Sequence, residues 1–152
     1  MKKISSIFIA TSLLLLSVSI NAQTVPVEKI QKLLDKAAGQ KYLSIVGSEQ
    51  KLTKQVFTVN SYVMSYTGLG KYGSKWVLEY TGINWYSGFN HFSTTENSNS
   101  KLTRFVFDLK DKHSFYMHVE GEGDNKKSTR NSLEFYVLTK DAEEMEALLK
   151  TN

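Results

Sequence analysis

The 152-residue chain contains no cysteine, one proline and three histidines. Without cysteine it can form no disulfide, and it lacks the residue on which a bacterial lipoprotein carries its lipid. Outside the extreme N-terminus, no uncharged apolar run reaches the roughly 20 residues that a membrane-spanning helix needs. We therefore expect a domain that is stabilised by its hydrophobic core alone.

Common catalytic motifs are also missing. The sequence has no cysteine nucleophile, Gly-x-Ser-x-Gly elbow, His-Glu-x-x-His pair, phosphate loop or dinucleotide fingerprint. His113 and His118 lie five positions apart on one predicted strand, so they should point to opposite faces and cannot share a metal. The acidic run from Glu120 is not a calcium loop, because Asn131 stands where a bidentate glutamate is needed. We expect no catalytic residues, no cofactor and no metal site.

The N-terminus has the composition of a secretory leader. Lys2 and Lys3 precede an apolar stretch from Ile7 to Leu16, and Ala22 supplies the small residue that a signal peptidase requires. The alternative, a retained membrane anchor, needs a longer apolar stretch. We predict a signal peptide over residues 1–22 and a single domain over residues 23–152. The protein is then exported, periplasmic or secreted, with no transmembrane segment once the leader is removed.

The net charge gives little indication of a polyanionic partner. Lys2 and Lys3 account for two of the 19 basic residues, so 17 basic and 15 acidic residues remain and the formal charge falls from +4 to +2. The remaining basic residues are scattered, and no basic run is longer than Lys126-Lys127. This pattern is typical of a solvated surface and predicts no nucleic-acid partner.

Helical patterns stand at both ends of the predicted domain. Near the N-terminus, Pro26 falls in a first turn, and apolar residues recur at helical spacing from Val27 until Gly39 ends the pattern. Near the C-terminus, Asp141 and Glu144 have the spacing of a capping box. We predict an amphipathic helix at each end.

Between the helices the apolar pattern changes to a period of two, which is typical of strands. One long strand is predicted over Val56–Tyr66 and a second over Lys75–Tyr80. The glycines that separate them favour an antiparallel hairpin. Residues 42–46 are compatible with either a helix or a strand.

A second hairpin is predicted further along the chain. Its strands are Leu102–Leu109 and His113–Val119, with Lys110-Asp111-Lys112 as the turn. Residues 121–131 are rich in glycine, charge and small polar groups and read as a flexible connection. A last strand is expected over Leu133–Val137.

These elements predict an α+β fold: an N-terminal helix, about five antiparallel strands in a bent sheet or partial barrel, and a C-terminal helix. Over roughly residues 50–150 the chain resembles the pleckstrin-homology-like superfold. The resemblance rests on Ile83-Asn84-Trp85, the Leu102–Val119 hairpin, and Ser132–Val137 running into the last helix. It implies binding of lipids, peptides or proteins, but no binding residue carries over. A cystatin-like sheet around the N-terminal helix is the alternative topology.

Aromatic residues are concentrated in one segment, with ten of them between Phe57 and Phe92. Those in the loop after Gly82 follow no strand period and stand beside amide and histidine side chains, a mixture that suits stacking and hydrogen bonding to a ligand. The alternative is a loop that packs back on the sheet. The candidate ligand-binding residues are Trp85, Tyr86, Phe89, His91 and Phe92.

Two functions follow from this loop. The first is an exported non-catalytic binding module for a protein, peptide, glycan or lipid of the cell envelope or the extracellular space. The second is a small exported enzyme or inhibitor with a polar site near His91, assembled with Glu79 or Glu96. The lack of catalytic motifs favours the first.

Overall fold

The computed structural model describes residues 25–44, 48–68, 73–85, 92–96, 101–119 and 126–150. Within these ranges, only the backbone is described for residues 96, 110–114 and 119. The predicted leader, residues 1–22, lies outside the described residues.

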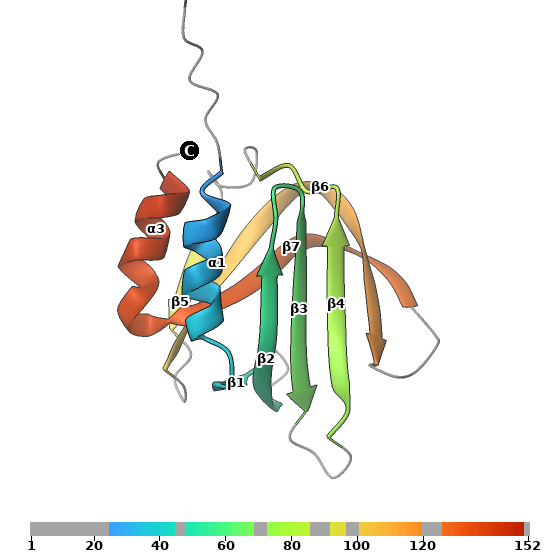
Figure 1. The fold of residues 1–152 in the computed structure, drawn as a ribbon. Coiled ribbons are helices and arrows are strands. Elements are labelled where there is room, and N and C mark those ends of the chain that lie inside the picture. Colours follow the sequence, from blue (N-terminus) through green and yellow to red (C-terminus); the bar gives the residue numbers. More distant parts are fainter. Residues whose placement is uncertain are drawn as a thin grey trace, which may run out of the picture.

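The described chain is mostly antiparallel sheet (Figure 1). The helical elements are α1 (Val27–Lys36), a short 3-10 turn η1 (Thr139–Asp141) and α3 (Ala142–Lys150). The strands are β1 (Lys41–Leu43), β2 (Glu49–Phe57), β3 (Ser61–Gly68), β4 (Lys75–Thr81), β5 (Phe92–Glu96), β6 (Leu102–Val119) and β7 (Lys126–Leu138). They form one sheet in the order β1-β2-β3-β4-β6-β5, with β7 paired to β6.

The predicted α+β class with about five strands is therefore wrong. Seven strands pair in a single curled sheet in the described part of the chain, and only two short α-helices accompany them. The prediction failed because the strand predicted over Val56–Tyr66 is two strands, the two predicted within Leu102–Val119 are one, and β1 and β5 were not predicted as strands. In addition, β7 begins earlier than its apolar residues indicate. Polar residues from Lys126 to Arg130 still pair with β6, since edge positions exposed to solvent need no apolar side chain.

The single long strand predicted over Val56–Tyr66 is in fact a hairpin. β2 and β3 pair antiparallel from Gln50↔Gly68 to Phe57↔Tyr62. The Thr58 hydroxyl accepts hydrogen bonds from the backbone N–H groups of Asn60 (3.3 Å) and Ser61 (3.0 Å). A threonine that binds nearby backbone groups in this way favours a turn, so the period of two continues through a reversal of the chain.

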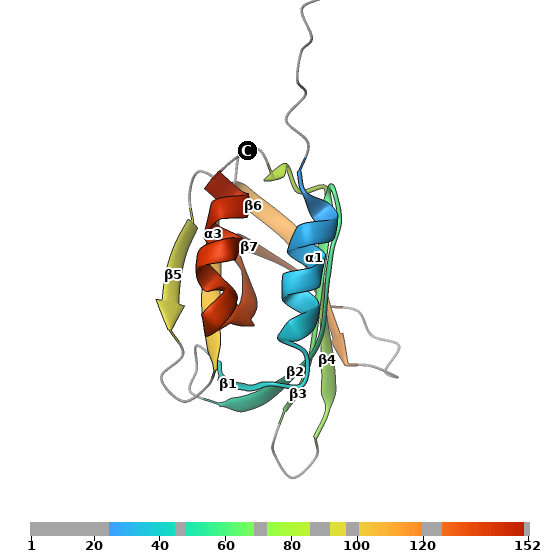
Figure 2. The ribbon, with the colours of Figure 1, turned by 60° about the vertical axis from the view of Figure 1, so that its left-hand side comes forward.

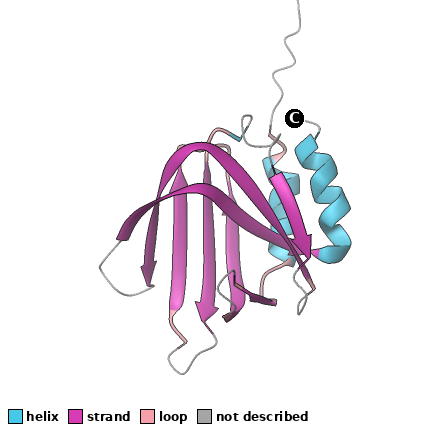
Figure 3. Ribbon diagram, turned by 180° about the vertical axis from the view of Figure 1, so that it is seen from behind, coloured by secondary structure: helices cyan, strands magenta, loops and turns pink. Residues whose placement is uncertain are grey.

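The predicted β3–β4 hairpin is confirmed, with pairs running from Ser61↔Thr81 to Thr67↔Lys75. The second predicted hairpin is wrong, because β6 continues through Lys110-Asp111-Lys112 as one 18-residue strand. Its pairing with β7 shifts register between Asp108 and His113. Extra residues on one strand of a pair increase its bend and twist, and Figure 3 shows β6 and β7 arching together across the molecule.

The bend in β6 curls the sheet into a half-barrel. One end of β6 pairs with β5 and the other end pairs with β4, while β7 follows its opposite edge. Figure 2 shows α1 and α3 side by side across the open side of the curl. The sheet therefore encloses an interior that the two helices close.

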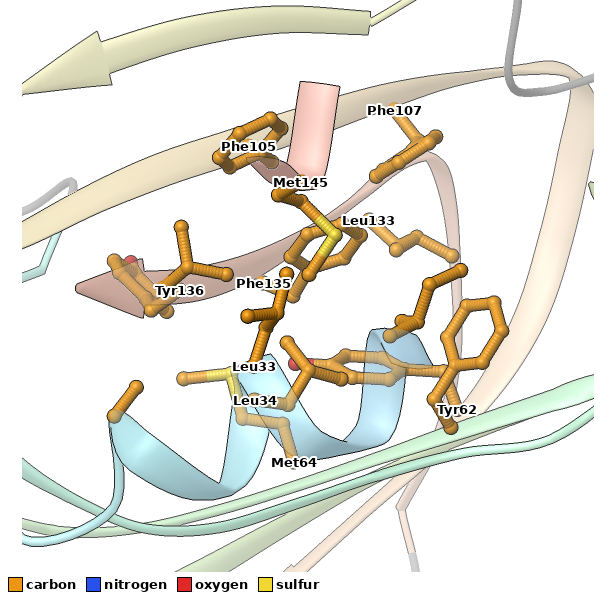
Figure 4. Close-up of a cluster of buried hydrophobic side chains, with 14 of the residues drawn as sticks. Leu33, Leu34, Tyr62, Met64, Phe105, Phe107, Leu133, Phe135, Tyr136 and Met145 are labelled. Carbon is orange, nitrogen blue, oxygen red and sulfur yellow. The ribbon is translucent and has the colours of Figure 1, made fainter. Parts of the chain in front are cut away.

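The helices close the half-barrel because each buries one apolar stripe. Leu33 and Leu34 of α1 and Met145 of α3 are at most 2% exposed. They meet rings from the bent strands, including Phe105 and Phe135, which stack with 5.3 Å between centroids (Figure 4). Since aromatic side chains bury the most area per residue, this cluster is the main core of the fold.

Two glutamines join the free strand edges where the sheet does not close on itself. Gln55 of β2 donates from Nε2 to the Tyr136 carbonyl (2.7 Å) and accepts from the Tyr136 N–H (2.8 Å). Gln31 of α1 donates to the Gln55 carbonyl (2.9 Å) and accepts from the Phe57 N–H (2.8 Å). Each side-chain amide thus takes the place of a neighbouring strand's peptide group, and together they link β2, α1 and β7.

Candidate functional site

A cavity of about 150 Å³ opens in the concave face of the half-barrel. Its apolar floor consists of Met64, Leu78 and Met117. These residues come from β3, β4 and β6 and are directly aligned across the sheet, because Met64 pairs with Leu78 and Leu78 pairs with Met117. Cross-strand partners point to the same face, so three adjacent strands build one continuous apolar surface.

The side of the cavity near β1 and β2 is polar. Ser44 and Gln50 line it together with the Tyr42 ring. The Tyr42 hydroxyl donates to Gln50 Oε1 over 2.6 Å, and its ring lies 4.4 Å from that of Tyr136. Burial raises the pKa of Tyr42, so its hydroxyl remains a neutral hydrogen-bonding group.

The side near β7 carries the charged groups. The Glu134 carboxylate is 3.8 Å from Arg104 Nη1. Burial raises the pKa of Glu134, and the opposing effects of Arg104, the Tyr136 hydroxyl and Arg130 are smaller. Arg104 Nε and Tyr136 Oη are buried without a hydrogen-bond partner of standard geometry. Glu134 therefore lies in a polar cluster whose hydrogen-bonding capacity is not fully used.

Arg130 stands at the exposed side of the same cavity. Its Cζ lies 5.1 Å from the centroid of the Phe115 ring, within cation–π distance. Burial raises the pKa values of Tyr66 and Tyr80, and the positive charge of Arg130 opposes this rise in both. No carboxylate of the described residues forms an ion pair with it.

We predict that Glu134 makes the stability of the protein depend on pH. Because its pKa is raised by folding, the folded state binds more protons than the unfolded state between the two pKa values. The free energy of unfolding of the wild type should fall as pH rises through this window. Glu134→Gln removes this titration, so the stability of the variant relative to the wild type should increase with pH.

Urea unfolding from about pH 4 to about pH 8 measures this difference. Glu143→Gln is the matched control, since it removes the same charge from an exposed position on α3. Parallel stability curves for Glu134→Gln and the wild type would contradict the assignment of Glu134 as a carboxyl destabilised by burial.

The structure places two of the five predicted loop residues. Trp85 is 1% exposed, and its Nε1 donates to the Thr58 carbonyl over 2.8 Å. Its ring packs 4.4 Å from Phe57, so it belongs to the core. Phe92 is partly buried against the rings of Phe105 and Phe107. The rings at the two ends of the loop thus pack on the sheet, while the loop between them lies outside the described residues.

Tyr86, Phe89 and His91 lie outside the described residues, so their ligand-binding role stays a prediction. The same holds for the enzyme site near His91, since of its two predicted partners only Glu79 has a described side chain.

Sequence reasoning missed the charged residues of the cavity. Arg130 was assigned to a flexible connection, and Glu134 lay within the last predicted strand but was not singled out. The sequence did place these residues together, because Arg130, Glu134 and Tyr136 stand at alternate positions of β7 and therefore share one face. That face is turned toward the interior of the curled sheet.

Comparison with known proteins gives no identification. No family model matches the chain, and no curated protein and no solved structure is significantly similar to it. The resemblance to the pleckstrin-homology-like superfold thus stays a prediction. Among the described helices, none is long and apolar enough to span a membrane. Nor does any cluster of three or more His, Asp or Glu side chains suited to a metal occur in the described ranges.

Proposed function

We propose that this protein is a non-catalytic binding module whose ligand site is the concave cavity of the half-barrel. The observation that carries the proposal is the composition of the cavity wall. A floor of Met64, Leu78 and Met117 faces a rim that carries Arg130 and Glu134. Ligand sites typically combine such an apolar surface with a few polar groups that fix orientation.

The floor suits a binding role because it is partly made of methionine. Met64 and Met117 have flexible, polarisable side chains that adapt to the shape of an apolar group. The strands that carry them are paired on both sides, which fixes the backbone of the floor. We also propose that the module works outside the cytoplasm, because residues 1–22 have the composition of a secretory leader.

Filling the cavity should block binding. Benzyl alcohol, a neutral ring with one polar group, should shift the backbone amide resonances of Met64, Leu78 and Met117 when it is titrated into the ¹⁵N-labelled protein. Met117→Trp should reduce these shifts at least severalfold, because the larger ring occupies the space that the ligand needs. Met117→Phe is a milder version in case the tryptophan disturbs the sheet.

Tyr116→Trp is the matched control. Tyr116 is 39% exposed and alternates with Met117 on β6, so a ring enlarged there points away from the cavity. Its variant should bind benzyl alcohol like the wild type. The proposal fails if the resonances of the floor residues do not respond to any small aromatic ligand, or if Met117→Trp and Met117→Phe both bind as well as Tyr116→Trp.

A further inference from the structure

We propose that the cavity binds a small monocarboxylate whose charged group contacts Arg130 and whose apolar part lies on the floor of Met64, Leu78 and Met117. The inference rests on the proposed function, because it names the ligand class of the same site. It is carried by the charges around the cavity, the position of the guanidinium group and the volume available.

The charges favour an anion. Glu134 is paired with Arg104 over 3.8 Å, whereas Arg130 has no carboxylate partner among the described residues. Arg104 lies outside the cavity lining and is the ion-pair partner of Glu134, so Glu134, which also interacts with Arg130, compensates the charge of Arg130 only in part. A ligand carboxylate would compensate it, while a ligand ammonium group would have to compete with Arg104 for Glu134.

The guanidinium group of Arg130 is suited to a carboxylate. Arginine presents its N–H donors in a planar fork that matches the two oxygens of a carboxylate. The Phe115 ring, 5.1 Å from Cζ, supports the guanidinium on one face. Tyr66 also lines the cavity, and its pKa responds to the charge of Arg130. Arg130 is an exposed side chain, and its charged group therefore stands at the mouth of the cavity, next to the apolar floor.

The volume limits the apolar part of the ligand. A cavity of about 150 Å³ is the size that accommodates one benzene molecule. A single ring or a branched chain of similar size fills this volume, whereas a fused ring system or a long acyl chain would extend beyond it. The expected ligand thus combines one carboxylate with one compact apolar group.

Three ligands that share a ring and differ in charge test the inference: benzoate, benzyl alcohol and benzylamine. In amide chemical-shift titrations at constant pH and low ionic strength, benzoate should bind about tenfold more tightly than the other two. Arg130→Gln should abolish this preference, because it removes the guanidinium that distinguishes a carboxylate from an alcohol.

Lys127→Gln is the matched control, because it removes the same charge from the same strand. Lys127 is exposed and stands at an odd position of β7, so it points away from the face that carries Arg130. This variant should keep the preference for benzoate. Equal losses of benzoate affinity in Arg130→Gln and Lys127→Gln would show a general charge effect and overturn the inference.

The possible failures are distinguishable. If all three ligands shift the resonances of Met64, Leu78 and Met117 with equal affinity, the binding site stands and the carboxylate inference is overturned. If none of the three shifts them, the proposed function itself fails. Preference for benzylamine would reverse the charge assignment and also overturn the inference.

A carboxylate next to one compact apolar group can belong to a free acid or to the C-terminus of a peptide. Phenylacetate and N-acetyl-glycyl-phenylalanine both place a carboxylate near one ring, and only the second extends away as a chain. Binding of phenylacetate alone would identify a free acid, and binding of both would identify a chain end as a ligand. Loss of the binding in Arg130→Gln is expected in either case, and its retention contradicts the inference.

Discussion

Replacing Trp85 by alanine is expected to lower the free energy of unfolding by about 3 to 5 kcal/mol. Trp85 is 1% exposed and packs against Phe57 at 4.4 Å and against Phe107 at 5.9 Å between ring centroids. The substitution removes a large buried ring and also the donor to the Thr58 carbonyl, which lies 2.8 Å from Nε1. Both losses act on the turn between β2 and β3. Urea unfolding followed by circular dichroism measures the change.

Trp76→Ala is the control for this prediction, because it makes the same substitution at a partly exposed position on β4. Its effect should be clearly smaller. The chain has two tryptophans, so the Trp76→Phe variant reports on Trp85 alone, and its fluorescence should be blue-shifted as for a buried indole. An effect of Trp85→Ala no larger than that of Trp76→Ala, with emission typical of an exposed indole, would remove Trp85 from the core.

The burial of Trp85 affects how the aromatic loop, the ligand site predicted from the sequence, can be tested. A ring that lies between Phe57 and Phe107 offers no free face to a ligand. A loss of binding in Trp85→Ala would therefore be confounded by loss of stability, and Phe89→Ala or His91→Ala is the cleaner test of the loop. The sequence identified an unusual density of rings but not its cause, since core packing and ligand binding call for the same residues.

Local sequence patterns correctly predicted the elements whose formation depends on residues close together in the chain. The apolar stripe from Val27 and the alternation from Lys75 to Tyr80 correspond to α1 and β4. The predictions that failed concern elements that depend on contacts between segments far apart in the sequence. Lys110-Asp111-Lys112 has the composition of a turn, yet β6 continues because β4 and β7 pair with the strand beyond it. A pairing partner more than ten residues away leaves no mark in a local pattern.

The cavity was unpredictable for the same reason. Its floor needs the registers of three strands to align Met64, Leu78 and Met117. Its charged side needs the curl of the sheet to turn the Arg130 and Glu134 face of β7 inward. From sequence, a charged residue that alternates with apolar ones is assigned to solvent, and only closure of the half-barrel reverses that assignment.

Closure itself depends on Gln55, and Gln55→Leu is expected to lower the free energy of unfolding by about 3 kcal/mol or more. The Gln55 side chain makes two hydrogen bonds to the Tyr136 backbone and accepts a third, 2.7 Å long, from the Tyr62 hydroxyl. Leucine fills a similar volume but leaves these three polar groups buried without partners. Each such group costs about 1 to 3 kcal/mol. Equilibrium unfolding in urea measures the loss.

Gln31→Leu is the informative comparison, because Gln31 also makes two hydrogen bonds to strand backbone, with the Gln55 carbonyl and the Phe57 N–H. Gln31 is partly exposed, whereas Gln55 is 2% exposed, so water can replace the lost amide only at Gln31. We expect a loss of about 1 kcal/mol there.

Gln55→Glu should be as harmful as Gln55→Leu above the pKa of the new carboxyl, since a carboxylate cannot donate to the Tyr136 carbonyl. Equal, small effects at both glutamines would show that these side-chain amides do not hold the edges of β2 and β7 together, and that the cavity wall carrying Glu134 does not depend on the link.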